Sequence, residues 1–310
     1  MNVFGTGYPA IDLREARVLI TGGGRGIGQA TAELFAGKGS RVAVADVDGA
    51  AARAVAAALG GRAYELDVRD RAGWAAVVAD LGGVDVLVNN AGVMPAGAFL
   101  AEPDAVGHTT IDVNVWGLIH GMRAVVPGMT ERGRGHVVNV ASLAGKIPLP
   151  GLAVYNASKF AAVGLSAATR LEFAEHGVSV SCVLPSAVRT RLSSGLALGH
   201  GLPTVDPEDV AAAIVKTCRT RRAEVAVPGY LDPVDLALAA APEPAVRLVR
   251  RLFRGDRALH PSDRQTRAAY ENQIRAIAEN SGEDRPDIRN TDRTAIRTEY
   301  LGPEGVPRNS

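Results

Sequence analysis

Residues 18–29 read Val-Leu-Ile-Thr-Gly-Gly-Gly-Arg-Gly-Ile-Gly-Gln, and this stretch decides the fold. A short apolar run ends in a glycine-rich turn, and a helical pattern rich in Ala, Leu and Glu follows at once. Glycines let the backbone turn tightly and let a pyrophosphate approach without Cβ atoms in its way, while the N–H groups at the helix start face the anion. The stretch therefore predicts a phosphate-binding turn between a strand and a helix.

The alternation of apolar runs and helical patterns continues along the chain. The runs are rich in Val, Ile and Leu and apolar almost throughout, which is typical of strands buried on both faces of a parallel sheet. Ala-rich stretches between them suit helices, so right-handed crossovers are expected. The fold class is α/β, a Rossmann-type doubly wound parallel sheet in three layers, α/β/α. The expected strands are residues 18–20, 42–45, 84–88, 136–140, 178–184 and 224–227.

A single Rossmann-type dinucleotide-binding and catalytic domain is expected from residue 1 to residue 235, with a C-terminal extension over residues 236–310. In the extension, residues 244–254 form an amphipathic, Arg-rich helical pattern. Such a helix can contact a membrane surface, but it more often packs against protein. Residues 281–310 are polar and charged, which indicates an extended arm. We expect the extension to cover the substrate cleft or a subunit interface.

The composition excludes several classes of function. The 34 Lys plus Arg residues nearly balance the 33 Asp plus Glu residues, so the formal net charge is +1 and no nucleic-acid partner is expected. The 2 Cys and the 6 His residues lack the spacing of a disulfide framework or a metal site. No signal-like or membrane-spanning apolar run is found. A cytoplasmic protein without a bound metal is expected.

Asp46, which follows the second expected strand, bears on the choice of coenzyme. It stands 18 residues after Gly28, where a carboxylate accepts hydrogen bonds from the ribose hydroxyls of NAD and repels the 2′-phosphate of NADP. Asp46 could otherwise cap a helix or a turn. Arg25 in the glycine loop could instead neutralise a 2′-phosphate. We expect NAD, with NADP as the alternative.

Tyr155 and Lys159 are four residues apart at the start of a helical pattern, so both side chains lie on one face. A tyrosine hydroxyl has an ordinary pKa of about 10, and a nearby ammonium lowers this pKa by favouring the phenolate. Ser142 follows an expected strand, where its hydroxyl can hydrogen-bond a substrate oxygen. These residue types suit proton exchange with an alcohol or a carbonyl, although the pair alone could be an ordinary surface contact.

Together the motifs resemble the short-chain dehydrogenase/reductase family, in that family's order and spacing over about residues 16–230. The resemblance implies an NAD(P)-dependent oxidoreductase that acts on CH–OH groups. The residues that carry it are Thr21-Gly22-x-x-x-Gly26-x-Gly28, Asn89-Asn90-Ala91-Gly92, Ser142 and Tyr155-x-x-x-Lys159.

The resemblance implies a catalytic set of Asn114, Ser142, Tyr155 and Lys159. As a phenolate, Tyr155 takes the hydroxyl proton while a hydride leaves the carbinol carbon for the nicotinamide. Lys159 lowers the Tyr155 pKa and binds the nicotinamide ribose, and Ser142 orients the reacting oxygen. Asn114 holds a water that replenishes the proton.

The resemblance also implies the residues that hold the coenzyme. Asp67 is expected to meet the adenine amino group, and Thr190 is expected to meet the nicotinamide carboxamide. The family usually has Pro-Gly after the strand that corresponds to residues 178–184, whereas here Ser186 follows Pro185. The expected cofactor-binding residues are Gly22, Gly24, Arg25, Gly26, Ile27, Gly28, Asp46, Asp67, Val68, Asn89, Ala91, Gly92, Tyr155, Lys159, Pro185, Val188 and Thr190.

Substrate loops in this family correspond here to residues 93–99, 143–152 and 186–202. Their apolar side chains indicate a pocket for a hydrophobic secondary alcohol or ketone, such as a steroid, terpenoid or fatty-acyl derivative. Loop cations could instead bind the anionic carrier of an NADP-dependent 3-oxoacyl thioester reductase. A non-catalytic dinucleotide-binding protein is the remaining alternative, and a homodimer or homotetramer is expected. The expected substrate-binding residues are Met94, Ser142, Tyr155, Leu143 and Leu149.

Overall fold

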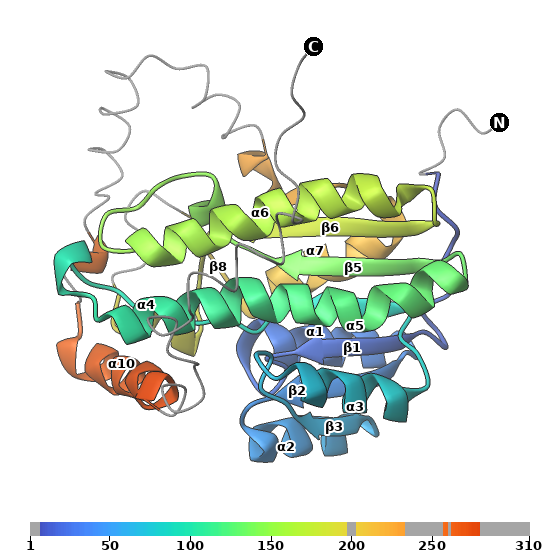
Figure 1. Ribbon diagram of the computed structural model, residues 1–310, viewed down its shortest axis with the longest axis horizontal. Coiled ribbons are helices and arrows are strands. Elements are labelled where there is room, and N and C mark those ends of the chain that lie inside the picture. Colours follow the sequence, from blue (N-terminus) through green and yellow to red (C-terminus); the bar gives the residue numbers. More distant parts are fainter. Residues whose placement is uncertain (1–6, 197–202, 233–256, 260–261, 280–310) are drawn as a thin grey trace, which may run out of the picture.

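The computed structural model describes residues 7–196, 203–232, 257–259 and 262–279. Its centre is a seven-stranded parallel sheet in the order β3-β2-β1-β4-β5-β6-β9 (Figure 1). The strand order reverses between β1 and β4, which confirms the predicted doubly wound, Rossmann-type α/β fold. The strands are β1 (Arg17–Thr21), β2 (Arg41–Asp46), β3 (Arg62–Glu65), β4 (Val86–Asn89), β5 (Gly135–Val140), β6 (Val178–Pro185) and β9 (Glu224–Val227).

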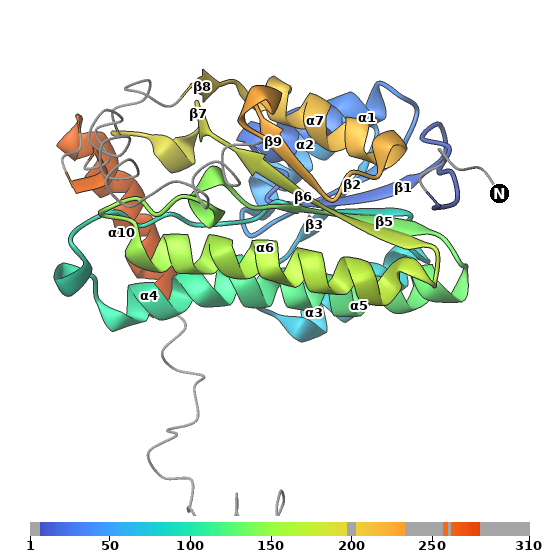
Figure 2. The same cartoon turned by 90° about the horizontal axis from the view of Figure 1, so that it is seen from above.

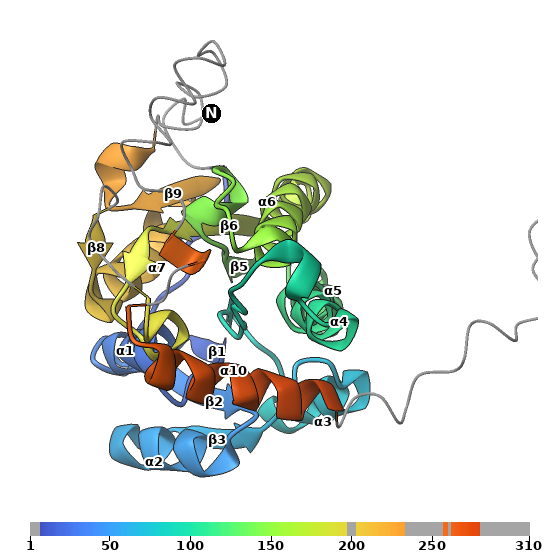
Figure 3. The same ribbon diagram turned by 90° about the vertical axis from the view of Figure 1, so that its left-hand side faces the viewer.

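Helices cover both faces of the sheet, as Figures 2 and 3 show. One layer holds α1, α2 and α7, and the other holds α3, α4, α5 and α6. Beyond β6, the short strands β7 (Ala187–Val188) and β8 (Thr204–Val205) pair with each other. The helices are α1 (Gly26–Ala36), α2 (Gly49–Leu59), α3 (Arg71–Leu81), α4 (Asp104–Ile111), α5 (Gly117–Glu131), α6 (Ala153–Ala174) and α7 (Pro207–Thr220).

The hydrophobic core lies on both faces of the sheet, which explains why the strands read as continuous apolar runs. Along β1, Ile20 belongs to the cluster that contains Phe35 of α1, whereas Leu19 belongs to the cluster that contains Trp74 of α3. All four of these side chains are almost completely buried. Strands β4, β5 and β6 are buried along their whole length, as predicted for the centre of a parallel sheet.

Strand β3, at one edge of the sheet, is absent from the predicted strands because it carries no apolar run. It reads Arg-Ala-Tyr-Glu, with Arg62 and Glu65 exposed and the two residues between them only partly buried. The pattern that identifies the buried strands therefore does not identify this one, whereas β9 at the other edge reads Glu-Val-Ala-Val and was predicted.

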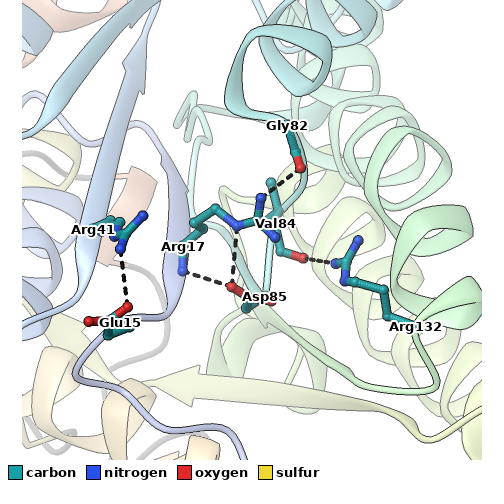
Figure 4. A network of polar contacts seen from close by, with 7 residues as sticks. All are labelled: Glu15, Arg17, Arg41, Gly82, Val84, Asp85 and Arg132. Carbon is teal, nitrogen blue, oxygen red and sulfur yellow. Dashed lines mark hydrogen bonds and ion pairs between the residues drawn. The ribbon is translucent and has the colours of Figure 1, made fainter.

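A network of hydrogen bonds joins the amino-terminal ends of neighbouring strands of the sheet (Figure 4). The carboxylate of Asp85 accepts the backbone N–H of Arg17 at 2.9 Å, and the Arg17 guanidinium donates to the Gly82 carbonyl at 2.6 Å. The Arg132 guanidinium donates to the Val84 carbonyl at 2.7 Å. These bonds join the starts of β1 and β4, and the paired part of β4 begins at Val86, two residues after the predicted start. The opposite ends of the same two strands carry the site described below.

The C-terminal part of the chain crosses the carboxyl ends of the strands. Helix α10 (Arg264–Glu279) lies there in front of β1 and β2 (Figure 3), and a 3-10 turn (Arg257–Leu259) precedes it. The amphipathic segment 244–254 and the polar arm 281–310, both predicted from the sequence, lie outside the described residues. Over the described ranges, none of the helices has the length and apolarity that crossing a membrane requires.

Candidate active site

The glycine loop after β1 is closed tightly enough that side chains would block it. A Cβ atom on Gly28 would lie 2.1 Å from the carbonyl oxygen of Gly22, so the loop and the first turn of α1 can meet only with glycine there. The Asn90 amide donates to the carbonyls of Thr21 and Gly22, both at 3.0 Å. These bonds from Asn90, in the segment 89–92 at the end of β4, fix the position of the glycine loop, as binding of a pyrophosphate requires.

The carboxylate of Asp46 lies directly behind this loop. It accepts the backbone N–H of Gly24 at 2.9 Å and the backbone N–H of Asp48 at 3.0 Å. Asp48, not Asp46, caps α2 by accepting the N–H of Ala51. Arg25 forms an ion pair with Asp48, so the cation of the glycine loop is already partnered by a carboxylate. The carboxylate of Asp46 retains lone pairs for ribose hydroxyls, because each oxygen accepts one backbone N–H.

In the same cavity, Asp67 is joined to Arg69, a residue that was not singled out from the sequence. The Arg69 Nε donates to the Asp67 carboxylate at 2.9 Å, and the backbone N–H of Arg69 does so at the same distance. Burial alone would raise the pKa of Asp67, but the bonds from Arg69 outweigh it and hold the pKa below its usual value. Asp67 is therefore an anionic acceptor, and both residues line the cavity with Val68.

The predicted catalytic residues meet at the carboxyl end of β5. Ser142 follows this strand and accepts the N–H of Ala144 at 3.1 Å, while Tyr155 and Lys159 lie on the first turns of α6. The Lys159 ammonium lies 5.6 Å from the centre of the Tyr155 ring and donates to the Val140 carbonyl at 3.1 Å. Tyr155 and Lys159 are both only 5% exposed.

Burial dominates the ionisation of this pair. It raises the pKa of the Tyr155 hydroxyl above its usual value, and a hydrogen bond with Ser142 acts in the opposite direction. Burial also lowers the pKa of Lys159 to about 8. The pKa of Tyr155 is thus raised, in contrast to the lowering that the sequence predicts from Lys159, and the nearby Tyr270 also acts to raise it. A further positive charge beside Tyr155 would favour the phenolate.

Asn114 lies in a π-helical turn (Asp112–Trp116) between α4 and α5, and it is completely buried. Its side-chain oxygen accepts the N–H of Val93 at 2.8 Å, and its amide donates to the Val93 carbonyl at 2.9 Å and to the Ser158 hydroxyl at 3.0 Å. The side chain thus clamps the substrate loop after β4 to α6. π-Helical turns are common at functional sites.

Pro185, Val188 and Thr190 line the cavity beyond β6. Ser186 replaces the glycine that the family usually has, and the turn tolerates it because Ser186 does not adopt a left-handed backbone conformation. Its N–H donates to the Val227 carbonyl at 2.9 Å, and its hydroxyl donates to the Pro203 carbonyl at 2.7 Å. The turn formed by Pro185 and Ser186 is therefore stabilised by the two hydrogen bonds that Ser186 donates.

One cavity of about 640 Å³ joins most of these groups, although Gly24, Gly28, Asn89 and Asn114 are not among the residues that line it. Part of the glycine loop, Asp46, Asp67 and residues 90–92 line one part of it, and apolar side chains of the loops after β4, β5 and β6 line the other. Met94, Leu143 and Leu149 all line it, as predicted. A dinucleotide fits this arrangement chemically, because the glycine cradle suits phosphates and the carboxylates suit ribose hydroxyls and an adenine amino group.

Comparison with known proteins agrees with this geometry. Residues 16–199 match the family model described as short chain dehydrogenase. The 2,5-dichloro-2,5-cyclohexadiene-1,4-diol dehydrogenase of Sphingobium indicum is 39% identical, over 58% of this chain and 75% of that protein. Oxidoreductase UcpA of Salmonella typhimurium is 35% identical, over 72% of this chain and 85% of that protein. A crystal structure of a short-chain dehydrogenase from Streptomyces avermitilis is 31% identical and matches with a TM-score of 0.63, over 73% of this chain and 96% of that one.

The chain belongs to the short-chain dehydrogenase family. As a short-chain dehydrogenase it is an oxidoreductase that acts on CH–OH groups with a nicotinamide coenzyme. The glycine loop, Ser142, Tyr155 and Lys159 all fall within the residues that match the family model. Helix α10 falls outside those residues.

Two residues of α10, Arg267 and Tyr270, contact the loops around this cavity and were not predicted from the sequence. Arg267 is 2% exposed, and its guanidinium donates to the carbonyls of Met94 and Leu192, which belong to two different substrate loops. Tyr270 accepts the backbone N–H of Met94 at 3.1 Å and lines the cavity. The signal available in the sequence was the helical spacing of Tyr270, Ile274 and Ile277.

Proposed function

We propose that this short-chain dehydrogenase transfers a hydride between NAD and a hydrophobic secondary alcohol or its ketone, with Tyr155 as the general acid and base. The observation that carries the proposal is the meeting of Ser142, Tyr155 and Lys159 in one cavity. The glycine loop opens into the same cavity, and apolar loops surround the remaining part. A coenzyme and an apolar substrate can therefore reach the same hydroxyl groups.

In alcohol oxidation, Tyr155 Oη takes the proton of the substrate hydroxyl, while Ser142 donates a hydrogen bond that fixes the substrate oxygen. NAD, when bound, would supply the hydride acceptor, and the positive charge of its nicotinamide ring would favour the Tyr155 phenolate. Lys159 lies behind Tyr155, where its ammonium can bind ribose hydroxyls. Asn114 keeps the loop after β4 against α6, and we propose that its turn also holds the water that returns the proton.

The coenzyme preference is proposed to be NAD because of the charges beside the glycine loop. The Asp46 carboxylate is fixed by two backbone N–H groups where the adenosine ribose would lie. A 2′-phosphate would meet this charge, and the cation that could compensate, Arg25, is paired with Asp48. NADP therefore remains the weaker alternative.

The apolar cavity favours a cyclic or otherwise hydrophobic alcohol, and the cyclohexadienediol substrate in one relative's name is of this kind. An acyl thioester is less well supported, because two loop cations that could bind its carrier are already paired. Lys146 lies 2.8 Å from Glu224, and Arg189 lies 2.7 Å from Asp206. The remaining loop cation, Arg191, lines the cavity.

A screen of NADH and NADPH formation tests the proposal. The protein is assayed with saturating NAD or NADP on steroid, terpene, cyclic, aliphatic and 3-hydroxyacyl alcohols. We expect the highest kcat/KM with NAD and an apolar cyclic alcohol. Turnover of 3-hydroxyacyl thioesters alone, with NADP, would replace the proposal by the thioester reductase. Coenzyme binding without turnover of any alcohol would support the non-catalytic alternative.

A further inference from the structure

Helix α10 presents one of its faces to the cavity. Tyr270, Gln273, Ile274 and Ile277 follow the spacing of one helical face, and all four line the cavity. Ile274 and Ala278 are buried in the core cluster that also contains Val106 of α4, and α10 packs against that helix. The part of the wall that α10 supplies is apolar except for Tyr270 and the exposed Gln273.

The Tyr270 ring is held in one place. The Arg267 guanidinium lies 5.0 Å from the centre of the ring. That guanidinium is itself fixed, because it donates to the Leu192 carbonyl at 3.1 Å, to the Met94 carbonyl, and to Glu271 at 2.9 Å. The N–H of Met94 then reaches the Tyr270 hydroxyl oxygen at 3.1 Å. A phenol fixed from both ends loses little conformational freedom when it binds a ligand.

The hydroxyl hydrogen of Tyr270 is left without an acceptor. The oxygen is the acceptor in its bond with Met94, and within the described part of the chain no group accepts the hydrogen in return. Burial raises the pKa of Tyr270, so the hydroxyl stays protonated at neutral pH. A protonated donor in an apolar wall gains most from a ligand that carries an acceptor.

In the proposed reaction Ser142 and Tyr155 already bind the reacting oxygen of the substrate. Ser142 follows β5 and Tyr155 lies on α6, whereas Tyr270 projects from α10 into the same cavity, close enough to Tyr155 for the two phenols to interact electrostatically. An acceptor at Tyr270 would therefore be a different atom of the substrate. We propose that Tyr270 is a specificity-determining residue that donates a hydrogen bond to a second oxygen of the substrate, as in a diol or a hydroxyketone. This inference rests on the proposed alcohol oxidation.

The test compares alcohols that differ by one oxygen. Wild type and Tyr270→Phe are assayed with saturating NAD on cyclohexanol and on the 1,2-, 1,3- and 1,4-cyclohexanediols. We expect wild type to prefer at least one diol over cyclohexanol, and Tyr270→Phe to lower kcat/KM for that diol about tenfold while changing cyclohexanol less than about twofold. The loss should lie in KM and not in kcat, because the bond is present in both ground and transition states.

Tyr64→Phe is the matched control, because Tyr64 lies on the edge strand β3, its hydroxyl donates to Asp80 of α3, and it is not among the residues that line the cavity. NADH binding and the thermal midpoint of each variant show that it is folded. An equal loss on cyclohexanol and on the diol would overturn the inference and leave Tyr270 as a support for the Met94 loop. Wild type without a preference for any diol would overturn it as well. Failure of wild type to oxidise any alcohol, with NADH still bound, would instead contradict the proposed function and withdraw the inference with it.

Discussion

Lys159 is a buried lysine whose cost to folding depends on pH. Its pKa falls from 10.5 to about 8 in the folded protein, because burial disfavours the ammonium. Below about pH 8 the side chain is charged in the folded and the unfolded state, and the folded state is disfavoured by about 3 kcal/mol. As pH rises towards about 10.5 the folded state is already neutral, so the cost disappears. The destabilisation that burial of the charged Lys159 causes therefore disappears in alkaline solution.

Lys159→Met should consequently stabilise the fold most at neutral pH. The gain in the free energy of unfolding over wild type should be about 2 kcal/mol larger at pH 7 than at pH 9.5. The lost bond to Val140 offsets the gain by a similar amount at both pH values. Urea unfolding at pH 7 and at pH 9.5 measures the gain in the free energy of unfolding at each pH. Lys216→Met, at an exposed lysine, is the control. A gain that does not change with pH would show that Lys159 titrates normally.

Asp48 bears on coenzyme choice through Arg25. Asp48→Asn keeps an oxygen that can cap α2 but removes the charge that pairs with Arg25. The freed cation can then approach a 2′-phosphate, so the ratio of kcat/KM for NADP to that for NAD should rise about fivefold. Asp70→Asn, which alters the cap of α3 in the same way, should leave the ratio unchanged. The same ratio in wild type and Asp48→Asn would remove Arg25 from the account of specificity.

At the scale of elements, α10 depends on Arg267 for its place over the cavity. The guanidinium bonds two loop carbonyls, and Gly195 lets one loop approach closely, since a Cβ atom there would lie 2.7 Å from the Arg267 Cβ. Gly195 also has a φ of 74°, which favours glycine. The helix and two substrate loops are thus one packed unit.

Arg267→Met should loosen this unit without unfolding the sheet. The Met94 and Leu192 carbonyls lose their donor, so amide hydrogens of α10 should exchange at least about tenfold faster, while those of β5 and β6 keep their protection. Hydrogen exchange read by mass spectrometry resolves the two regions. The exposed Arg275→Met on the same helix is the control. Unchanged exchange in α10 would show that apolar packing alone holds the helix.

At the scale of the whole molecule, the sequence predicts the parts of the fold whose signals are local. Buried central strands such as β5 read as apolar runs, and the glycine loop and the Tyr155–Lys159 spacing predict neighbours that the structure brings to one cavity. β3 was missed because its sequence, Arg-Ala-Tyr-Glu, contains no apolar run. Arg267 and Tyr270 were missed because their partners lie more than 70 residues away, at Met94 and Leu192, and no local pattern encodes such contacts.

The central claim is that Tyr155 exchanges the proton of an alcohol whose hydride passes to the coenzyme. The most direct test is single-turnover NADH formation by wild type and Tyr155→Phe, at saturating NAD and with the best alcohol from the screen. The account predicts that Tyr155→Phe lowers the rate at least about a thousandfold, while NADH binding, followed by fluorescence, stays within about threefold of wild type. A variant that binds NADH and still turns over within about tenfold of wild type would contradict the account.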